Sequence, residues 1–370
     1  MKPDILKERK SVSLGKKWFI FFFAFLCCME ATAEGSIVSF QRMQGFPSDE
    51  PGIEKGVSAC FAGRIGSTLV MAGGCNFPET PAAEGGAKRY YQGIYAASIG
   101  QGDVLEWKKI GELPVRAAYG ASVSTKDGVI CIGGNHERGS LRSVFKIQLQ
   151  QGRAVIKHLP SLPVAMDNLT AALQGHLLMV RGGRYLYALD LRHLSKGWEK
   201  WIAFGNTLLQ PVSGFSGGYY HVWGGYVPKS KGSKASLSID GFSYGKSIQP
   251  VEAPVDELGE KVFLGGGASV NLNRDQILVV GGVNKDIFLQ ALNDPQLNYM
   301  THPAAWYHFN PCIFLYDRGQ WKMIGKSRVT ARAGAALVAY HQEVYIIGGE
   351  LKPGIRTPEI YRMTIQTNNL

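Results

Sequence analysis

The chain has 370 residues, a formal net charge of +11, 46 glycines and only 19% charged residues. Its hydrophobic content of 45% supports a sizeable core and excludes an intrinsically disordered chain. The low charge density argues against a coiled coil, and the glycines follow no three-residue period, which excludes collagen. The length fits two or three domains or one large closed β structure.

Residues 1–33 have the three parts of a cleavable secretory signal. Met1–Lys17 is polar and basic, Trp18–Cys28 is apolar, and Ala31–Ala33 forms an A-x-A site. The apolar run is far shorter than the ~20 residues of a spanning helix, so we expect cleavage, secretion and no stable membrane insertion afterwards. Cleavage leaves a charge of +8 with no Lys/Arg-rich block. This predicts no nucleic-acid binding and suits a small anionic ligand or a polyanionic surface.

The rest of the chain repeats a short aliphatic run followed by a glycine doublet. The six doublets are Gly73-Gly74, Gly133-Gly134, Gly182-Gly183, Gly224-Gly225, Gly281-Gly282 and Gly348-Gly349. Each run predicts a buried strand, and two glycines at its end allow a sharp turn and close packing.

Other strands recur around each doublet. A strand with small residues precedes most doublets, a strand with a central aromatic follows, and a fourth strand often carries tryptophan, as at Trp107 and Trp321. This four-strand pattern resembles the kelch repeat. Six copies imply an all-β, six-bladed kelch-type β-propeller that forms a single domain over residues 34–370.

Both ends of the chain are predicted to share one blade. The last repeat contains strands in Arg332–Ala339, Glu343–Gly348 and Glu359–Thr364 but lacks a fourth. Ile37–Phe46 resembles the fourth strands of other repeats. We therefore expect the N-terminal strand to complete the last blade, which would also fix that terminus.

Four cysteines remain after cleavage: Cys60, Cys75, Cys131 and Cys312. Their wide spacing excludes a cysteine-based zinc site. Buried free thiols and a single disulfide both fit. In the fifth repeat, Asp286–Asn310 is a long insertion with a short helical stretch. It fits either a wall over a ligand site or a surface elaboration packed on the rim.

The loop after the last doublet has the sharpest set of reactive side chains. Glu350, Lys352 and Arg356 lie within seven residues, and Pro353-Gly354 predicts a turn that lets them face one another. A carboxylate beside two cations can exchange protons, and an arginine can bind a carboxylate with two hydrogen bonds. By composition alone, an ordinary salt bridge within a loop fits at least as well.

Three segments resemble one enzyme family. GGELKPGIRT around Glu350 closely resembles a G-E-x-K-P-G-x-R-T segment of bacterial N-acetylneuraminate epimerases, the sialic acid mutarotases. GGVNKDIF (Gly281–Phe288) and ELPVRAAYG (Glu112–Gly120) resemble two further segments of that family. The order of the blades is rotated, which is typical of its cyclically permuted members. The resemblance implies a periplasmic isomerase that interconverts the α and β anomers of sialic acid, with no metal or organic cofactor.

The resemblance assigns the functional pair to Glu350 and Arg356. We expect Glu350 to act as general base and acid, and Arg356, helped by Lys352, to bind the substrate carboxylate. Asn284, Arg184 and Arg332 are candidate substrate-binding residues from other blades. Two alternatives stay open, namely a non-catalytic kelch module that binds a glycan or a protein, and another sugar-acid isomerase or lyase. A homodimer also remains open.

Overall fold

The computed structural model describes residues 36–367, and the predicted signal peptide lies outside them. Six antiparallel sheets surround one axis, and their innermost strands contact one another in a closed ring. The expected all-β, six-bladed propeller is confirmed. The innermost strands are β2 (Phe61–Ile65), β8 (Ala121–Thr125), β14 (Thr170–Gln174), β17 (Val212–Ser216), β23 (Ala268–Asn271) and β27 (Ala336–Tyr340).

Five blades continue outward through three more strands, and blade 3 continues through two. The second strands are β3 (Thr68–Ala72), β9 (Gly128–Ile132), β18 (Tyr219–Trp223), β24 (Gln276–Val280) and β28 (Glu343–Ile347). The third strands are β6 (Gly93–Ser98), β12 (Val144–Gln150), β21 (Gly241–Tyr244), β25 (Cys312–Asp317) and β31 (Ile360–Thr367). The outermost strands are β7 (Lys108–Glu112), β13 (Arg153–His158), β16 (Glu199–Leu208), β22 (Ile248–Val251), β26 (Gln320–Lys326) and β1 (Ser36–Met43).

In blade 3 a single long strand takes the place of two. The first half of β15 (Leu177–Asp190) pairs with β14 and its second half pairs with β16. A backbone hydrogen bond of 2.9 Å from Leu191 to His176 joins its two ends. The strand therefore doubles back at Gly182-Gly183.

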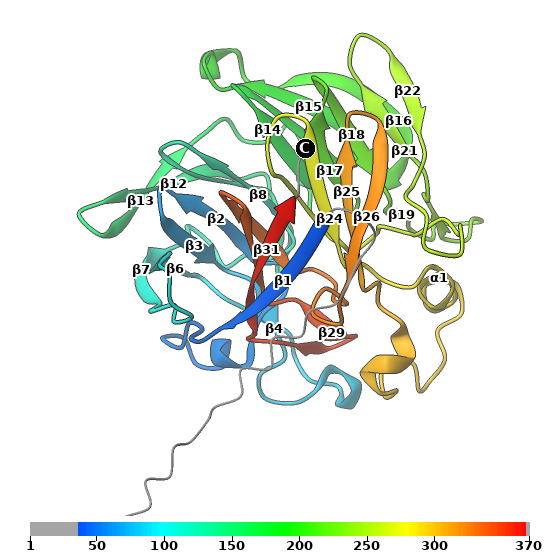
Figure 1. Cartoon of the computed structure of the whole chain (residues 1–370), viewed down its shortest axis with the longest axis horizontal. Helices are drawn as coiled ribbons and strands as arrows, with labels where there is room; N and C mark the ends of the chain where they lie inside the picture. Colours follow the sequence, from blue (N-terminus) through cyan, green and yellow to red (C-terminus); the bar gives the residue numbers. More distant parts are fainter. Residues whose placement is uncertain (1–35, 368–370) are drawn as a thin grey trace, which may run out of the picture.

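The N-terminal strand closes the last blade, as expected. β1 pairs antiparallel with β31 through eight residue pairs, from Ser36 with Thr367 to Met43 with Ile360. Figure 1 shows the two strands side by side, although they stand at opposite ends of the described chain. Val38 on β1 packs into the core between blades 5 and 6. The ring is thus closed by hydrogen bonds and by a shared apolar core.

The doublets end the second strands because neighbouring blades approach closely there. A Cβ atom on Gly348 would lie 2.4 Å from the carbonyl oxygen of Val57 in blade 1, and Gly348 has φ +60°. Only glycine fits such a contact at such a φ without strain. The repeat read from the sequence is therefore a requirement of blade-to-blade packing.

Four short hairpins connect second to third strands at the same end of the molecule. They are β4 (Cys75–Asn76) with β5 (Arg89–Tyr90), β10 (Asn135–His136) with β11 (Gly139–Ser140), β19 (Tyr226–Val227) with β20 (Ser236–Leu237), and β29 (Glu350–Lys352) with β30 (Ile355–Arg356). We call this end the hairpin end.

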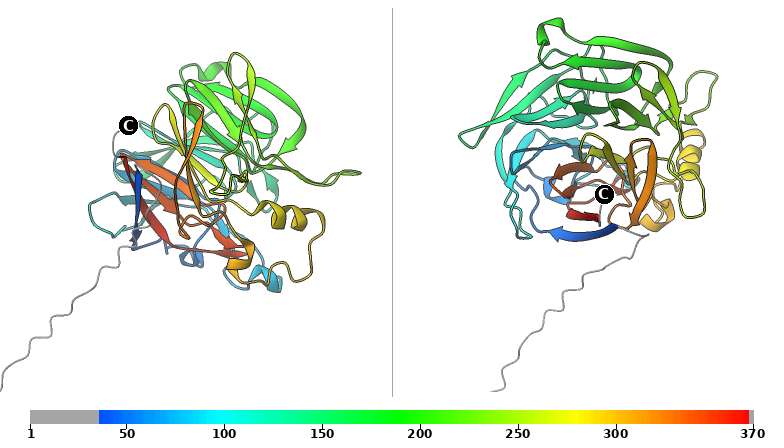
Figure 2. Two further views of the ribbon diagram at one scale, coloured as in Figure 1. Left: turned by 45° about the vertical axis from the view of Figure 1, so that its right-hand side comes forward. Right: turned by 45° about the horizontal axis from the view of Figure 1, so that its top comes forward.

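Blade 5 has the predicted helix there instead. α1 (Lys285–Asn293) belongs to the long insertion, which stands out from the body in Figure 2. The insertion also contains the short 3-10 helix η4 (Ala304–Tyr307), which contacts β29. Three further 3-10 turns are η1 (Ile53–Lys55), η2 (Ala82–Glu84) and η3 (Leu194–Lys196). No helix among the described residues is long and apolar enough to cross a membrane.

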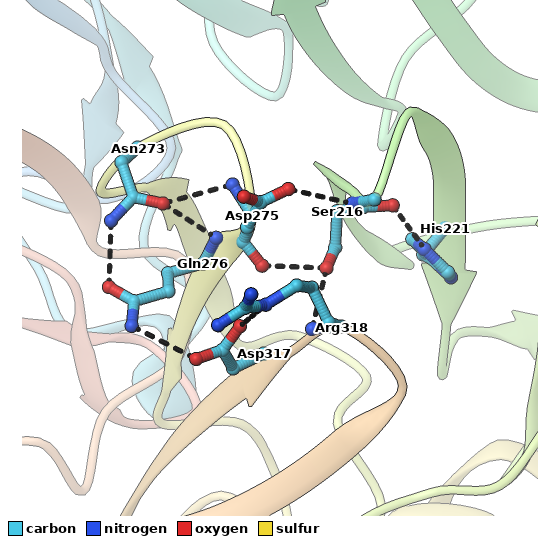
Figure 3. Close-up of polar contacts among 8 residues, drawn as sticks. Ser216, His221, Asn273, Asp275, Gln276, Asp317 and Arg318 are labelled. Atoms are coloured by element: carbon cyan, nitrogen blue, oxygen red, sulfur yellow. Dashed lines mark hydrogen bonds and ion pairs between the residues drawn. The ribbon is translucent and has the colours of Figure 1, made fainter. Parts of the chain in front are cut away.

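All four cysteines are buried and free, so the single disulfide is not formed in the structure. The opposite end of blades 4 and 5 holds a dense polar cluster (Figure 3). There the Ser216 hydroxyl donates to the Asp275 carbonyl oxygen at 2.6 Å, while His221 Nε2 lies 3.1 Å from the Ser216 carbonyl oxygen. Because His221 does not contact the hydroxyl, these residues form no nucleophile–base pair. The cluster joins turns of adjacent blades.

Candidate active site at the hairpin end

The hairpin β29–β30 brings Glu350 and Arg356 together. The two residues are cross-strand partners, and Arg356 Nη1 donates to Glu350 Oε1 at 3.0 Å. Gly354 occupies the turn at φ +84°, and its N–H donates to the same oxygen at 2.6 Å. Among the described residues, the hydrogen bonds to this carboxylate all reach Oε1. Oε2 is therefore the atom left to accept a proton.

Arg356 is held rigidly behind the carboxylate. Its side chain is only 4% exposed, compared with 23% for Glu350. Its Nε donates to Ser58 Oγ at 3.1 Å, and its guanidinium carbon lies 4.9 Å from the centre of the Phe77 ring. Burial is the largest single influence and disfavours the charged guanidinium, but Glu350 together with Tyr119 and Cys75 outweighs it and raises the pKa of Arg356 above its ordinary value. The pair is therefore a fixed cation beside a partly exposed carboxylate.

Lys352 and Asn284 make contacts within the protein. Lys352 Nζ donates to the carbonyl oxygens of His302 at 2.6 Å and Met300 at 3.4 Å, so it fastens the insertion to the hairpin. Asn284 is the N-cap of α1, where its side-chain oxygen accepts from two backbone N–H groups of the first turn. Each side chain thus has a structural task whether or not it also meets a ligand.

Arg332 and Arg184 likewise make their hydrogen bonds to residues other than Glu350 and Arg356. Arg332 is 2% exposed, and its guanidinium donates to the carbonyl oxygens of Val329 at 2.7 Å and Gly348 at 2.8 Å. It braces the doublet just before Glu350 from inside the protein. Arg184 is exposed and donates to the Phe204 carbonyl oxygen at 3.1 Å. Of the six predicted site residues, only Glu350 and Arg356 share a direct side-chain contact.

A ring of backbone hydrogen bonds closes around the axis beside the pair. One residue per blade, always at positive φ, donates its N–H to the carbonyl oxygen of the equivalent residue in the preceding blade, at 2.7–3.1 Å. The six residues are Ala59, Tyr119, Asn168, Gln210, Gly266 and Gly334. Gly334 follows Ala333, which exchanges two backbone hydrogen bonds with Glu350. The ring thus fixes the position of Glu350 relative to the axis.

The axial channel contains a cavity of about 420 Å³ lined by all six innermost strands. The lining residues lie within these strands, for example Ala62 and Ser122. They extend to Arg64 and His341, toward the end of the channel opposite the hairpin end. Glu350 and Arg356 are not part of this lining. The ring of hydrogen bonds stands between the cavity and the hairpin end.

Residues from other blades complete the surroundings of the pair, and none of them is among the candidates that the sequence suggests. Ser58, Phe77 and Tyr119 come from blades 1 and 2, and Lys88 from the long β4–β5 loop donates to the Tyr119 hydroxyl at 3.1 Å. Tyr119 lies inside the ELPVRAAYG segment, which was a signal available in the sequence. The others had no local signal.

The fold and this pair define a class of protein: a six-bladed propeller with a carboxylate–guanidinium pair at the hairpin end. Comparison with known proteins makes the assignment narrower. The chain belongs to the N-acetylneuraminate epimerase family, whose model matches residues 28–156 and 159–370.

Individual relatives match over part of their length. The N-acetylneuraminate epimerase of Salmonella enteritidis is 32% identical over 222 residues, which are 55% of this chain and 57% of the relative. The Yersinia enterocolitica protein of the same name is 31% identical over 232 residues, 57% of this chain and 58% of the relative. A solved structure titled "Structure of YjhT" has 26% identity and a TM-score of 0.48, covering 55% of this chain and 64% of that one. The matched segments thus span little more than half of each sequence relative.

Proposed function

We propose that the protein interconverts the α and β anomers of N-acetylneuraminic acid. The observation that carries the proposal is the Glu350 carboxylate, whose Oε1 is held by Arg356 and Gly354 while Oε2 is left as an acceptor. Relatives about 31% identical carry the name N-acetylneuraminate epimerase, and this name supplies the substrate.

The chemistry of anomer exchange needs such a carboxylate. Sialic acid closes as a hemiketal at a carbon that also bears a carboxylate group. Opening the ring removes a proton from the anomeric hydroxyl and breaks the bond between that carbon and the ring oxygen. Glu350 Oε2 takes the hydroxyl proton and returns it when the ring closes on the other face. The net reaction needs no oxidant or reductant.

Arg356 serves this reaction through its charge. Held between Ser58 and Phe77, it keeps Glu350 in one orientation and places a positive charge beside the bound substrate. A fixed cation suits an anionic sugar because the substrate carboxylate then compensates the guanidinium in a partly dry site. A periplasmic location after signal cleavage completes the proposal, and size analysis of the purified mature chain decides between monomer and homodimer.

The proposal is tested by proton NMR of freshly released α-sialic acid. We expect the wild-type protein to speed the decay of the α signal over buffer alone. In Glu350→Gln the amide still accepts the hydrogen bonds of Arg356 and Gly354 but takes no proton, so kcat should fall about 10²–10⁴-fold. Glu112→Gln, an exposed carboxylate on the outer strand β7, is the matched control and should keep the full rate.

Two outcomes would overturn parts of the proposal. A wild-type protein that binds sialic acid yet leaves the α decay at the buffer rate would be a non-catalytic kelch binding module. A Glu350→Gln variant with the wild-type rate would remove the role assigned to Glu350 and leave the activity standing.

A further inference from the structure

The Glu350–Arg356 pair accounts for only one of the two protons that ring opening moves. The ring oxygen gains a proton when its bond to the anomeric carbon breaks, and a permanently charged guanidinium is a poor donor of one. A neutral hydroxyl donor near the pair would complete the chemistry.

The ring of backbone hydrogen bonds has two unlike halves. Blades 5, 6 and 1 supply the small residues Gly266, Gly334 and Ala59, whereas blades 2, 3 and 4 supply the polar residues Tyr119, Asn168 and Gln210. A Cβ on Gly334 would make ordinary van der Waals contacts, 3.6 Å from the backbone nitrogen of Ala59 and from Ser58 Cβ, so this half of the ring is packed.

Tyr119 alone among the ring residues carries a hydroxyl, and its hydrogen bonding is informative. Lys88 Nζ lies 3.1 Å from the Tyr119 oxygen. An ammonium group only donates, so the tyrosine oxygen accepts there and its own proton points elsewhere. Burial, reinforced by the Cys75 thiol, raises the pKa of Tyr119 well above its ordinary value, although Arg356 acts in the opposite direction. The phenol therefore keeps its proton at neutral pH.

Contacts through neighbouring residues connect Tyr119 to the pair. The Tyr119 N–H donates to the Ala59 carbonyl oxygen at 2.9 Å, and the neighbouring Ser58 accepts from Arg356. The Phe77 ring is shared by both cations, with Arg356 4.9 Å and Lys88 Nζ 5.9 Å from its centre. Lys88, the hydrogen-bond partner of Tyr119, thus lies beside the same aromatic ring, Phe77, as Arg356.

We propose that Tyr119 is the general acid that protonates the ring oxygen of the sugar, with Lys88 stabilising the tyrosinate that results. This inference rests on the anomerase function proposed above. In the opening step, Glu350 takes the proton of the anomeric hydroxyl, and the bond between the anomeric carbon and the ring oxygen breaks. Its electron pair stays on that oxygen, which takes the Tyr119 proton. The products are a free ketone, an alcohol, a protonated Glu350 and a tyrosinate.

Closure reverses every transfer. The alcohol oxygen attacks the other face of the ketone and returns its proton to Tyr119, while Glu350 returns its proton to the former carbonyl oxygen. Charge is conserved, since one carboxylate becomes neutral as one phenol becomes an anion. The Lys88 ammonium compensates that anion at hydrogen-bond distance, which makes its formation less costly in a partly dry site.

The test compares kcat and KM for anomer exchange in wild-type protein, Tyr119→Phe, Lys88→Met and Lys88→Arg. We expect Tyr119→Phe to lower kcat about 10²-fold or more with KM within about threefold, because only proton transfer is lost. Lys88→Met should lower kcat about tenfold, and Lys88→Arg should recover most of that loss because it restores the positive charge. Tyr90→Phe is the matched control, since it removes a neighbouring hydroxyl on β5 and should leave kcat unchanged.

Each contrary result has a distinct meaning. If Tyr119→Phe keeps kcat within about threefold while wild-type protein is active, Tyr119 is not the acid and the proposed function stands. If Tyr119→Phe raises KM alone, Tyr119 binds the sugar and the general-acid role is refuted. If wild-type protein does not speed anomer exchange, the proposed function itself fails. Circular dichroism and thermal melting of each variant confirm that the compared proteins are folded.

Discussion

Arg332 offers a sharp test of how the site is held, because sequence and structure assign it different tasks. From the sequence we expect Arg332 to contact the substrate, whereas in the structure its side chain is 2% exposed and donates to the carbonyl oxygen of Gly348 in the last glycine doublet. The informative change is Arg332→Met, which keeps most of the aliphatic volume and removes the guanidinium.

The expected destabilisation follows from two hydrogen bonds. Nε and Nη1 donate to the carbonyl oxygens of Val329 at 2.7 Å and Gly348 at 2.8 Å. Hydrogen bonds to a charged donor contribute about 1.5–3 kcal/mol each, and release of the desolvated guanidinium offsets part of their sum. Burial of the charged guanidinium is unfavourable, since it lowers the pKa of Arg332. We expect a net loss of about 2–4 kcal/mol in the free energy of unfolding.

The assay is urea unfolding followed by tryptophan fluorescence, combined with KM for anomer exchange below the transition. Arg184→Met is the matched control. Arg184 is exposed and donates to one carbonyl oxygen, so its loss should change stability by no more than about 0.5 kcal/mol. If Arg332→Met leaves stability unchanged and raises KM about tenfold, Arg332 is a substrate ligand and the bracing role is refuted.

Three further predictions follow from the packing. Gly348→Ala should lower the free energy of unfolding by about 1–3 kcal/mol more than Gly66→Ala does. Both glycines have φ +60°, but only the Cβ on Gly348 would meet a carbonyl oxygen, at 2.4 Å. Equal unfolding free energies of the two variants would contradict the close contact between blades. Burial raises the pKa of Cys60 from 9.0 to about 12, so the folded state keeps this proton while the unfolded state releases it above pH 9. Stability should therefore fall between pH 9 and 12, and a Cys60→Val variant that lost stability as steeply as wild type would refute this origin. Lys352→Met should speed hydrogen exchange in residues 296–302 about tenfold or more, because the insertion loses its bond to the hairpin; unchanged exchange measured by mass spectrometry would show that other contacts hold it.

The fold was predictable because its main requirement is local in the sequence. Each doublet combines an aliphatic strand with two glycines, and five of the six doublets have both glycines at positive φ. Closure by the N-terminal strand was predictable for a related reason, because the last repeat lacked one strand and the first segment had no partner. The doubling of β15 at Gly182-Gly183 was hidden, since the pattern there looks like that of the other blades.

The site was predictable only where its residues are close in sequence. Glu350 and Arg356 are six positions apart and a Pro-Gly turn joins them, so a hairpin was enough to pair them. Ser58 is 298 positions from Arg356, and only the closed ring brings them together. The structural role of Asn284 could also have been predicted from the sequence, because an asparagine directly before a helical stretch is a preferred N-cap.

The six blades share one equivalent backbone position near the axis, but each blade has a different side chain there. This is why the propeller has a single reactive pair. The residue after each doublet is Cys75, Asn135, Arg184, Tyr226, Val283 or Glu350. In blades 1, 2, 4 and 6 this residue bridges to the residue just before the ring position, as Glu350 does to Ala333. The backbone thus presents equivalent places, and only the sixth holds a carboxylate. Because the ring is closed, the place of that blade along the chain does not matter to the site. Starting the chain at another blade would rotate the sequence order and leave the geometry around Glu350 unchanged.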